Sequence, residues 1–317
     1  METIQIDSIK IIDGHYVREG LACCYLMIDN NKGIIIETNT NHSIPYILRE
    51  IEKSQLKPED IEYIIITHVH LDHAGGAGKL MQICKNAKLL AHPKAARHII
   101  NPERLIQSSI QVYGEDNFKK LYGDIIPVPE DRVRIMEDGE EIVFGNRKLK
   151  FIYTRGHANH HFVIYDSQSN GVFTGDSFGL AYPILQEKGL FIIPTTSPTD
   201  FDPGEAKISI DKILNTNCDK VFLTHYGMIQ DLENAKNQLI EGINLSEDLL
   251  YWCLKNDISE QNKYNYVKQS LLEYFEDKIK RLNLEKTKER WEMLQLDAEL
   301  NTMGILYSAK RLVKKSN

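Results

Sequence analysis

The chain has 317 residues, of which 42% are hydrophobic, 26% charged and 9% aromatic, and its formal net charge is −7. This composition predicts a globular protein with a sizeable core, built as one large domain with an appendage or as two domains. The negative charge argues against the broad basic surface that binds nucleic-acid phosphates, so we expect no nucleic-acid partner.

The first ten residues, METIQIDSIK, lack the apolar stretch and the small-residue cleavage site of a signal peptide. The longest aliphatic cluster, around Ile64 to Ile66, is far too short to span a bilayer. We therefore expect a cytoplasmic protein that does not enter a membrane.

Up to about residue 228, the pattern is one of short strands that alternate with helices. Residues 4–12, 21–28 and 33–37 are rich in aliphatic residues and are separated by turn sequences, which predicts an antiparallel meander. A helix is predicted to begin near Ser43, where apolar residues start to recur at helical spacing. The next strand, at 63–67, is apolar on both faces, as is typical of a central strand covered by helices.

The remaining elements continue this alternation and then become entirely helical. Residues 93–130 are predicted to form a helical insertion between strands. Further strands are predicted at 132–136, 141–144, 148–153, 162–165, 172–174 and 220–223, with a helix at 202–214. We therefore predict a metal-binding domain over residues 1–228 and a C-terminal helical region over residues 229–317.

Histidine and aspartate residues gather directly after the predicted strands, and the densest group is His68-x-His70-x-Asp72-His73. Neutral imidazole and carboxylate groups suit zinc, iron and manganese, and sites with open positions are typically catalytic. A structural, hydrogen-bonded cluster is the simpler alternative. The metal site is favoured because four potential ligands converge within six residues, and unpaired polar groups beside a core are costly.

Four segments, in order along the chain, resemble the metallo-β-lactamase superfamily. They read THVHLDHAGG over 67–76, TRGH over 154–157, FTGDS over 173–177 and LTHYG over 223–227. The resemblance covers roughly the first 228 residues. It implies an αββα sandwich of two mixed sheets with helices outside, extended here by the C-terminal helices, with metals at one edge of the sandwich.

The resemblance also implies two divalent metal ions, with zinc expected and iron or manganese as alternatives. The implied ligands of the first metal are His68, His70 and His157. Those of the second metal are Asp72, His73 and His225, and Asp176 bridges the two. Asp72 and Asp176 are thereby expected to be catalytic residues. A bridging hydroxide would be the nucleophile, which predicts a hydrolase of an ester-like bond such as a thioester or a lactone.

The chain departs from glyoxalase II, a member of this superfamily, in the residues that would meet the substrate. Its second motif continues as TRGHANHH over 154–161, whereas glyoxalase II usually reads Thr-Pro-Gly-His-Thr-x-Gly-His, which argues against glutathione recognition. Four candidates for substrate contact remain: Arg155, His160, Tyr182 and Tyr226. The tyrosines would either donate a hydroxyl to an oxyanion or form a wall. Arg155 would attract an anion or form a salt bridge, and His160 would face the cleft or pack.

The main alternative is an iron-dependent redox enzyme of the same superfamily, of the persulfide dioxygenase or diiron type. Persulfide dioxygenases use one iron held by positions that match His68, His157 and Asp176. Flavodiiron proteins usually carry Glu where this chain has His70, which counts against dioxygen reduction. A binding or sensor protein and a nuclease are weaker alternatives, because all the implied ligands are present and no nuclease motif is recognisable. The expected partner is a small-molecule substrate, and a homodimer is left open.

Overall fold

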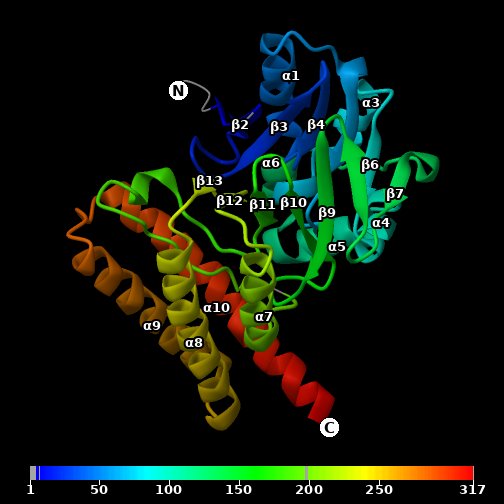
Figure 1. The fold of residues 1–317 in the computed structure, drawn as a ribbon. Coiled ribbons are helices and arrows are strands. Elements are labelled where there is room, and N and C mark those ends of the chain that lie inside the picture. The colour runs from blue at the N-terminus through cyan, green and yellow to red at the C-terminus, as the bar shows by residue number, and fades with distance from the viewer. Residues whose placement is uncertain (1–4, 7, 197–198, 317) are drawn as a thin grey trace. The chain divides into compact units, whose positions relative to one another are not determined.

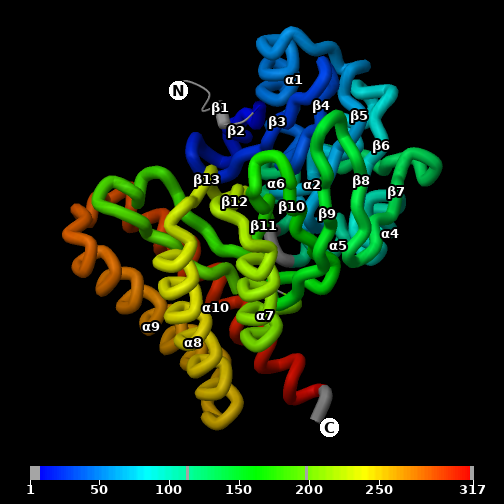
Figure 2. Tube along the Cα trace, viewed as in Figure 1, coloured from blue at the N-terminus to red at the C-terminus, as the bar shows by residue number. Residues whose placement is uncertain are grey.

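The computed structural model describes residues 5–6, 8–196 and 199–316, and the chain divides into two compact units (Figure 1, Figure 2). The sheet unit comprises residues 1–153, 160–175 and 216–228, and the helical unit comprises 154–159, 176–215 and 229–317. The sequence predicts a single division at residue 228, whereas residues 154–159 and 176–215 group with the C-terminal helices. Two residues of the first predicted strand, Ile4 and Asp7, lie outside the described residues.

The first sheet of the sheet unit has its described strands in chain order. They are β1 (Gln5–Ile6), β2 (Ile9–Asp13), β3 (Cys23–Asp29), β4 (Lys32–Ile36), β5 (Ile61–Ile65), β6 (Lys88–Ala91) and β7 (Val133–Ile135). Strands β1 to β4 pair antiparallel, which confirms the predicted meander. Strands β4 to β7 pair parallel, so each connection must cross over and carries helices.

The helices of the sheet unit belong to the connections that join one parallel strand to the next along the chain. They are α1 (Ile44–Lys53), α2 (Leu71–Ala74), α3 (Ala77–Ile83), α4 (Pro93–Ile100), α5 (Glu103–Tyr113) and α6 (Glu115–Tyr122). The last three fall within the predicted insertion. Phe118 and Tyr122 of α6 form an apolar cluster with Leu71 of α2, so the insertion packs beside the loop that carries the first histidines.

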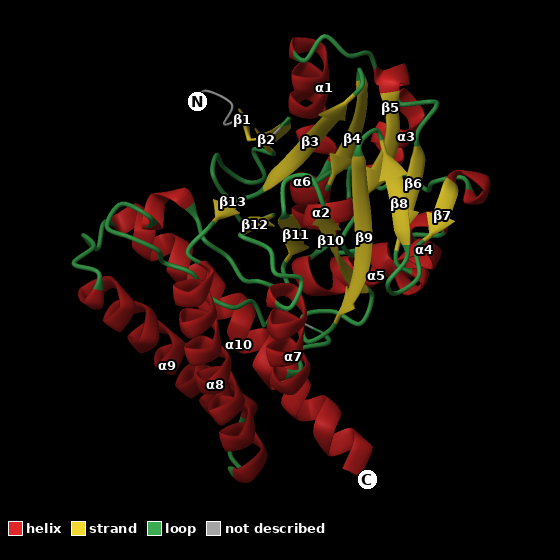
Figure 3. Ribbon diagram, viewed as in Figure 1, coloured by secondary structure: helices red, strands yellow, loops and turns green. Residues whose placement is uncertain are grey.

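The second sheet has the order β13-β12-β11-β10-β9-β8. Its strands are β8 (Glu141–Phe144), β9 (Arg147–Thr154), β10 (His161–Asp166), β11 (Gly171–Gly175), β12 (Lys220–Leu223) and β13 (Gly227–Ile229). Strands β8 and β9 pair antiparallel, as do β10 and β11, whereas β11 and β12 pair parallel. Both sheets are therefore mixed, as predicted (Figure 3).

The core follows from the alternation of side chains along each strand. Ile34 packs with Phe162 and Phe222 in the core between the two sheets. The next residue, Ile35, points to the opposite face and packs with α1, α3 and α4 in a second apolar cluster. This layering confirms the predicted sandwich.

The helical unit contains α7 (Pro203–Leu214), α8 (Leu232–Lys255), α9 (Glu260–Arg281) and α10 (Lys288–Ser316). Helix α7 begins where the sequence predicts, because the Asp202 carboxylate caps it by accepting a hydrogen bond from the Glu205 N–H at 3.0 Å. Helix α10 packs on α8 and α9, and α7 packs on α8. Helices α8, α9 and α10 confirm the predicted C-terminal extension. Among the described helices, none combines the length and apolar character needed to cross a membrane.

Candidate metal centre

Four of the predicted donors follow β5 in the sheet unit. His68 and His70 lie in the loop after the strand, and Asp72 and His73 lie on the short helix α2. The loop is tied to the segment that follows β4, because the Thr38 N–H donates to the His73 carbonyl at 2.8 Å and Asn39 Nδ2 donates to the Asp72 carbonyl at 2.9 Å. The donors are thus fixed by the sheet and are not free to swing with a surface loop.

Asp72, His73 and His225 form a compact donor group. One ligand atom of each lies within 4.8 Å of the others. The His225 Nε2 atom is 3.4 Å from Asp72 Oδ2, and His73 Nε2 is 3.9 Å from the same oxygen. His225 reaches this position because it follows directly on β12, as the sequence predicts. Two imidazoles and one carboxylate are a donor set that suits a divalent metal ion.

The second nitrogen of each ring in this group faces an acceptor. The Nδ1 atom of His225 is 2.7 Å from the Leu21 carbonyl oxygen, and Nδ1 of His73 is 3.1 Å from Glu37 Oε1. Neither partner can donate, so each Nδ1 carries the ring proton. Each Nε2 then presents a lone pair, as a metal ligand must.

Glu37 is a functional residue that the sequence reasoning missed. Its carboxylate is 1% exposed and accepts hydrogen bonds from the Thr67 N–H, the Thr67 hydroxyl and the Thr224 hydroxyl, besides His73. Glu37 also lies within ligand distance of His68 and His73. We assign it the orienting role because its oxygens are already engaged by both threonines. The one signal in the sequence is an acidic residue that ends an otherwise apolar strand.

Further histidine rings surround His68. The His70 ring centroid is 4.4 Å from that of His68, and the His161 centroid is 4.8 Å away. His160 lies 5.6 Å from His70 and 6.1 Å from His68, so its ring belongs to the histidine cluster. His68 and His161 are both fully buried.

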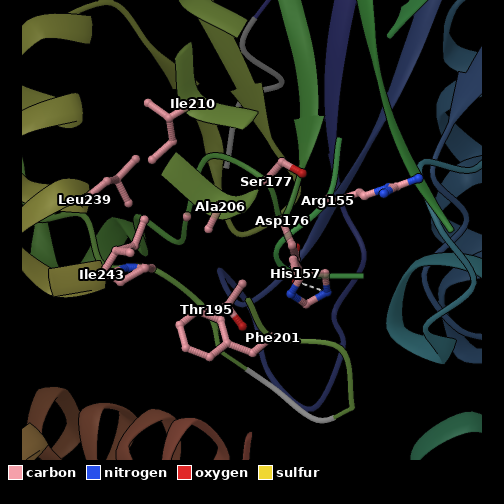
Figure 4. A pocket seen from close by; sticks show the side chains of 12 residues that line it. Arg155, His157, Asp176, Ser177, Thr195, Phe201, Ala206, Ile210, Leu239 and Ile243 are labelled. Carbon is pink, nitrogen blue, oxygen red and sulfur yellow. Dashed lines mark ion pairs between the residues drawn. The ribbon is translucent and has the colours of Figure 1, made fainter. Parts of the chain in front are cut away.

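The other two predicted donors, His157 and Asp176, lie together in the helical unit. His157 Nε2 is 3.5 Å from Asp176 Oδ2, and the side chains are 3% and 7% exposed (Figure 4). His157 follows β9, and Asp176 directly follows β11. Gly156 allows the tight turn before His157, because it adopts a φ of +102° and a Cβ there would lie 2.2 Å from the Ala206 nitrogen.

A pocket opens beside this pair, with all its lining residues in the helical unit. Figure 4 shows Ile210 of α7 with Leu239 and Ile243 of α8 on one side and His157 with Asp176 on another. The remaining lining residues are Arg155, Ser177, Gly179, Pro194, Thr195, Phe201 and Ala206. The pocket thus joins an apolar wall to a pair of potential metal ligands.

A sequence model of the metallo-beta-lactamase superfamily matches residues 17–226, which is more than half of the chain and includes every predicted ligand. The chain belongs to the metallo-β-lactamase superfamily. Its order of strands and its donor cluster agree with this membership.

Relatives within the superfamily extend the match. ST1585 of Sulfurisphaera tokodaii, described as a metallo-beta-lactamase fold-containing protein, is 31% identical over 183 residues, which cover 56% of this chain and 62% of that protein. The uncharacterized protein MJ0732 of Methanocaldococcus jannaschii is 26% identical over 241 residues, which cover 75% of this chain and 51% of that protein. The chain therefore spans less than two-thirds of the length of either relative in these matches.

Solved structures show the same fold. A crystal structure of ST1585 from Sulfolobus tokodaii gives a TM-score of 0.66 at 23% identity and covers 95% of this chain and 99% of that one. The metallo-beta-lactamase family protein TTHA1429 from Thermus thermophilus gives a TM-score of 0.65 at 17% identity, with 97% and 95% covered.

Tyr182 and Tyr226 were predicted to contact the substrate, but the hydroxyl of each donates a hydrogen bond to an aspartate. Tyr182 is buried, and its hydroxyl donates to Asp297 Oδ1 of α10 at 3.0 Å, which uses the proton that an oxyanion would need. The Tyr226 hydroxyl donates to Asp13 Oδ2 at 3.3 Å. Burial raises the pKa of Tyr226 well above its usual range, so this hydroxyl stays protonated.

Arg155 lines the pocket and is exposed. Its backbone N–H donates to Ser209 Oγ at 2.9 Å, and its carbonyl accepts from the same hydroxyl at 2.7 Å. In Figure 4 the guanidinium group points away from Ile210 and Leu239. Arg155 therefore stands at the rim of the pocket, and its attraction for an anion stays a prediction.

Proposed function

We propose that the chain is a dinuclear metal-dependent hydrolase of an ester-like bond, with a thioester or a lactone as the substrate class. Its superfamily consists mostly of hydrolytic enzymes. The observation that carries the proposal is the group of Asp72, His73 and His225, whose two rings both present Nε2 within 4.8 Å of a carboxylate oxygen.

The proposed metal sites follow the superfamily motifs. We propose that His68, His70 and His157 hold one ion, that Asp72, His73 and His225 hold the other, and that Asp176 is shared. Zinc is the expected metal. Two divalent ions held in this way lower the pKa of water and polarise a carbonyl group, which is the chemistry that hydrolysis at neutral pH requires.

The residues of the chain contribute orientation and charge. Glu37 and the Leu21 carbonyl hold the Nδ1 protons of His73 and His225, so neither ring can turn its protonated side toward the site. Asp72 and Asp176 supply negative charge that offsets the repulsion between two cations. The apolar wall beside His157 excludes water from the bound substrate.

Metal content and a substrate panel test this function together. The purified protein would be stripped with a chelator, reloaded with zinc, manganese or ferrous iron, and assayed on thioesters, lactones and phosphodiesters. We expect two zinc ions per chain and hydrolysis of a thioester or a lactone. One bound iron with oxidation of a persulfide would overturn the proposal in favour of the redox alternative, and cleavage of phosphodiesters alone would overturn the substrate class.

A further inference from the structure

Helix α10 has an inward face that packs within the helical unit. Leu294, Ala298 and Ile305 on this face are 0% exposed. Asn301 lies on the same face, and its Oδ1 atom accepts a hydrogen bond from the Thr196 N–H at 2.7 Å. Because these residues of α10 recur every three or four positions, they form one stripe along the helix. This inward stripe fixes α10 against its neighbours.

The outward face of α10 carries a second apolar stripe. Leu296 and Tyr307 are 45% and 47% exposed, and Leu300 and Met303 between them are half-buried. Single exposed apolar residues are common on protein surfaces. These four residues, however, recur at the alternating spacing of four and three that is typical of a helix packed against another helix. We call them the α10 seam, which extends over about three helical turns.

The charges at the two ends of the α10 seam have opposite signs. Glu289 and Glu292 lie before it on the same face of the helix and are exposed. Lys310 and Lys314 lie after it on that face and are also exposed. Lys310 pairs with Glu260 of α9 at 2.7 Å, but the two side chains are 58% and 57% exposed, and such an open ion pair is weak. An acidic end, an apolar middle and a basic end make a surface that is complementary to itself when turned end for end.

An antiparallel pair of α10 helices from two copies of the chain uses all of these features. If Leu296 of one copy lies opposite Tyr307 of the second copy, each step forward along one helix is a step back along the other. The same register therefore places Glu289 of one copy opposite Lys314 of the second copy. A two-fold axis repeats each of these contacts, so one surface serves both copies. A parallel pair would instead place like charges side by side, which is destabilising.

We propose that the chain forms a homodimer through antiparallel pairing of the α10 seam with the seam of a second copy. The apolar side chains supply the buried centre of the interface, and the charges at its ends select the antiparallel direction. A membrane surface suits this face less well, because the glutamates at one end would meet anionic lipid headgroups. The inference does not depend on the proposed hydrolase function.

Sedimentation equilibrium of the full chain tests the seam with a matched pair of tyrosines. Tyr307 of the seam is 47% exposed, and Tyr251 of α8 is 50% exposed. Wild type and Tyr251→Lys should both be dimers at micromolar concentration. Tyr307→Lys should weaken dimerisation by about 100-fold or more, because two charges would be buried in an apolar interface. Circular dichroism would establish that both variants are folded.

Two results would overturn the inference. The first is a wild type that is monomeric at these concentrations, including a monomer that sediments with phosphatidylglycerol vesicles. The second is an equal dissociation constant for Tyr307→Lys and Tyr251→Lys. If Tyr307→Lys does not fold, Leu296→Lys repeats the comparison at the other end of the seam, with the same expected loss of the dimer.

A charge exchange tests the antiparallel direction. At low salt, Glu289→Lys and Lys314→Glu should each weaken the dimer by about ten-fold, because each places like charges opposite one another. The double variant Glu289→Lys/Lys314→Glu should restore the wild-type dissociation constant, since the charges are only exchanged. Lys280→Glu, on α9, is the control and should not change dimerisation, because Lys280 lies away from the seam and is 71% exposed. A double variant that dimerises no better than the single variants would overturn the antiparallel pairing.

Discussion

The donors of the sheet unit and those of the helical unit are held in different ways. In the sheet unit, His73 and His225 are oriented by hydrogen bonds to particular acceptor atoms. In the helical unit, His157 and Asp176 contact each other beside a wall of aliphatic groups. Replacing one donor or acceptor atom removes a hydrogen bond. Exchanging one apolar side chain for another of similar volume has only a moderate cost in stability. Metal binding should therefore depend on single polar atoms, whereas the aliphatic side chains beside His157 should exchange for one another at moderate cost.

The largest effect is expected from Asp176→Asn. A neutral amide cannot offer two anionic oxygens to a pair of cations. Loss of a residue that only orients a metal ligand costs roughly 10–100-fold, so loss of a shared ligand should lower activity by more than that. Bound metal and turnover would both be measured. Asp248→Asn, on the exposed face of α8, is the control and should behave as wild type. Near-normal metal content and turnover in Asp176→Asn would remove this residue from the site.

His225→Ala should chiefly weaken one of the two metals. This substitution leaves Asp72 and His73 without the third donor of their group, whereas His68 and His70 are untouched. A chelator titration should release one metal early and one late. Simultaneous loss of both from a folded protein would contradict the proposed allocation, and His98→Ala, on α4, serves as the control.

Glu37→Gln tests the orienting hydrogen bonds of the sheet unit. The amide keeps the size of the side chain but its NH₂ group cannot accept the proton of His73, so metal affinity should fall by roughly 10–100-fold. Glu50→Gln is a matched control, because Glu50 is also buried but pairs with Lys10 and Lys53 instead of a histidine. Isothermal titration with zinc would measure the affinities. Equal affinities in the two variants would show that Glu37 has only a structural role.

The last effect concerns stability instead of metal binding, and it is expected in the packing of the helical unit, at Lys278. Its ammonium group is buried, donates to Gln238 Oε1 at 2.7 Å and lies over the rings of Phe191 and Tyr274. Burial lowers the pKa of Lys278 from its ordinary 10.5 to about 8. Between these two values the unfolded chain binds more protons than the folded chain, so the free energy of unfolding should rise with pH through this window.

Denaturant unfolding on either side of this window would measure the effect. The advantage of the wild type over Lys278→Met should grow with pH, by up to about 3 kcal/mol. Lys280→Met is the control because Lys280 is 71% exposed. A difference between wild type and Lys278→Met that does not change with pH would show that burial does not shift this pKa.

Much of the fold was predictable because its signals are local. Strands β8 and β12 have the bounds that the sequence predicts, since alternation and apolar runs act over a few neighbouring residues. The first predicted strand is instead two strands, β1 and β2, because Ser8 adopts a φ of +64° and turns the chain. A positive φ at a serine has no reliable sequence signal.

The less predictable features depend on residues that are distant in the sequence. Glu37 acquires its role from His73 and from Thr224, which lies 187 residues further along the chain. The Tyr182 hydroxyl meets Asp297 across 115 residues. Local sequence patterns contain no information about such distant pairs. The ligand motifs therefore predicted a metal site, but the residues that orient its histidines, such as Glu37, could be identified only in the structure.

Three glycines of the helical unit, Gly156, Gly179 and Gly242, should tolerate substitution less well than the aliphatic residues near them, and Gly179 also lines the pocket. Each lies where an added Cβ would come within 2.6 Å of a neighbouring atom, so substitution there displaces a helix or a loop. The aliphatic side chains that line the pocket can exchange for one another at lower cost. A library that exchanges Ile210, Leu239 and Ile243 among aliphatic residues and keeps the glycines fixed should therefore yield mostly folded variants, whereas a library that randomises the glycines should yield few. In related sequences, the three glycines should vary less than these aliphatic residues.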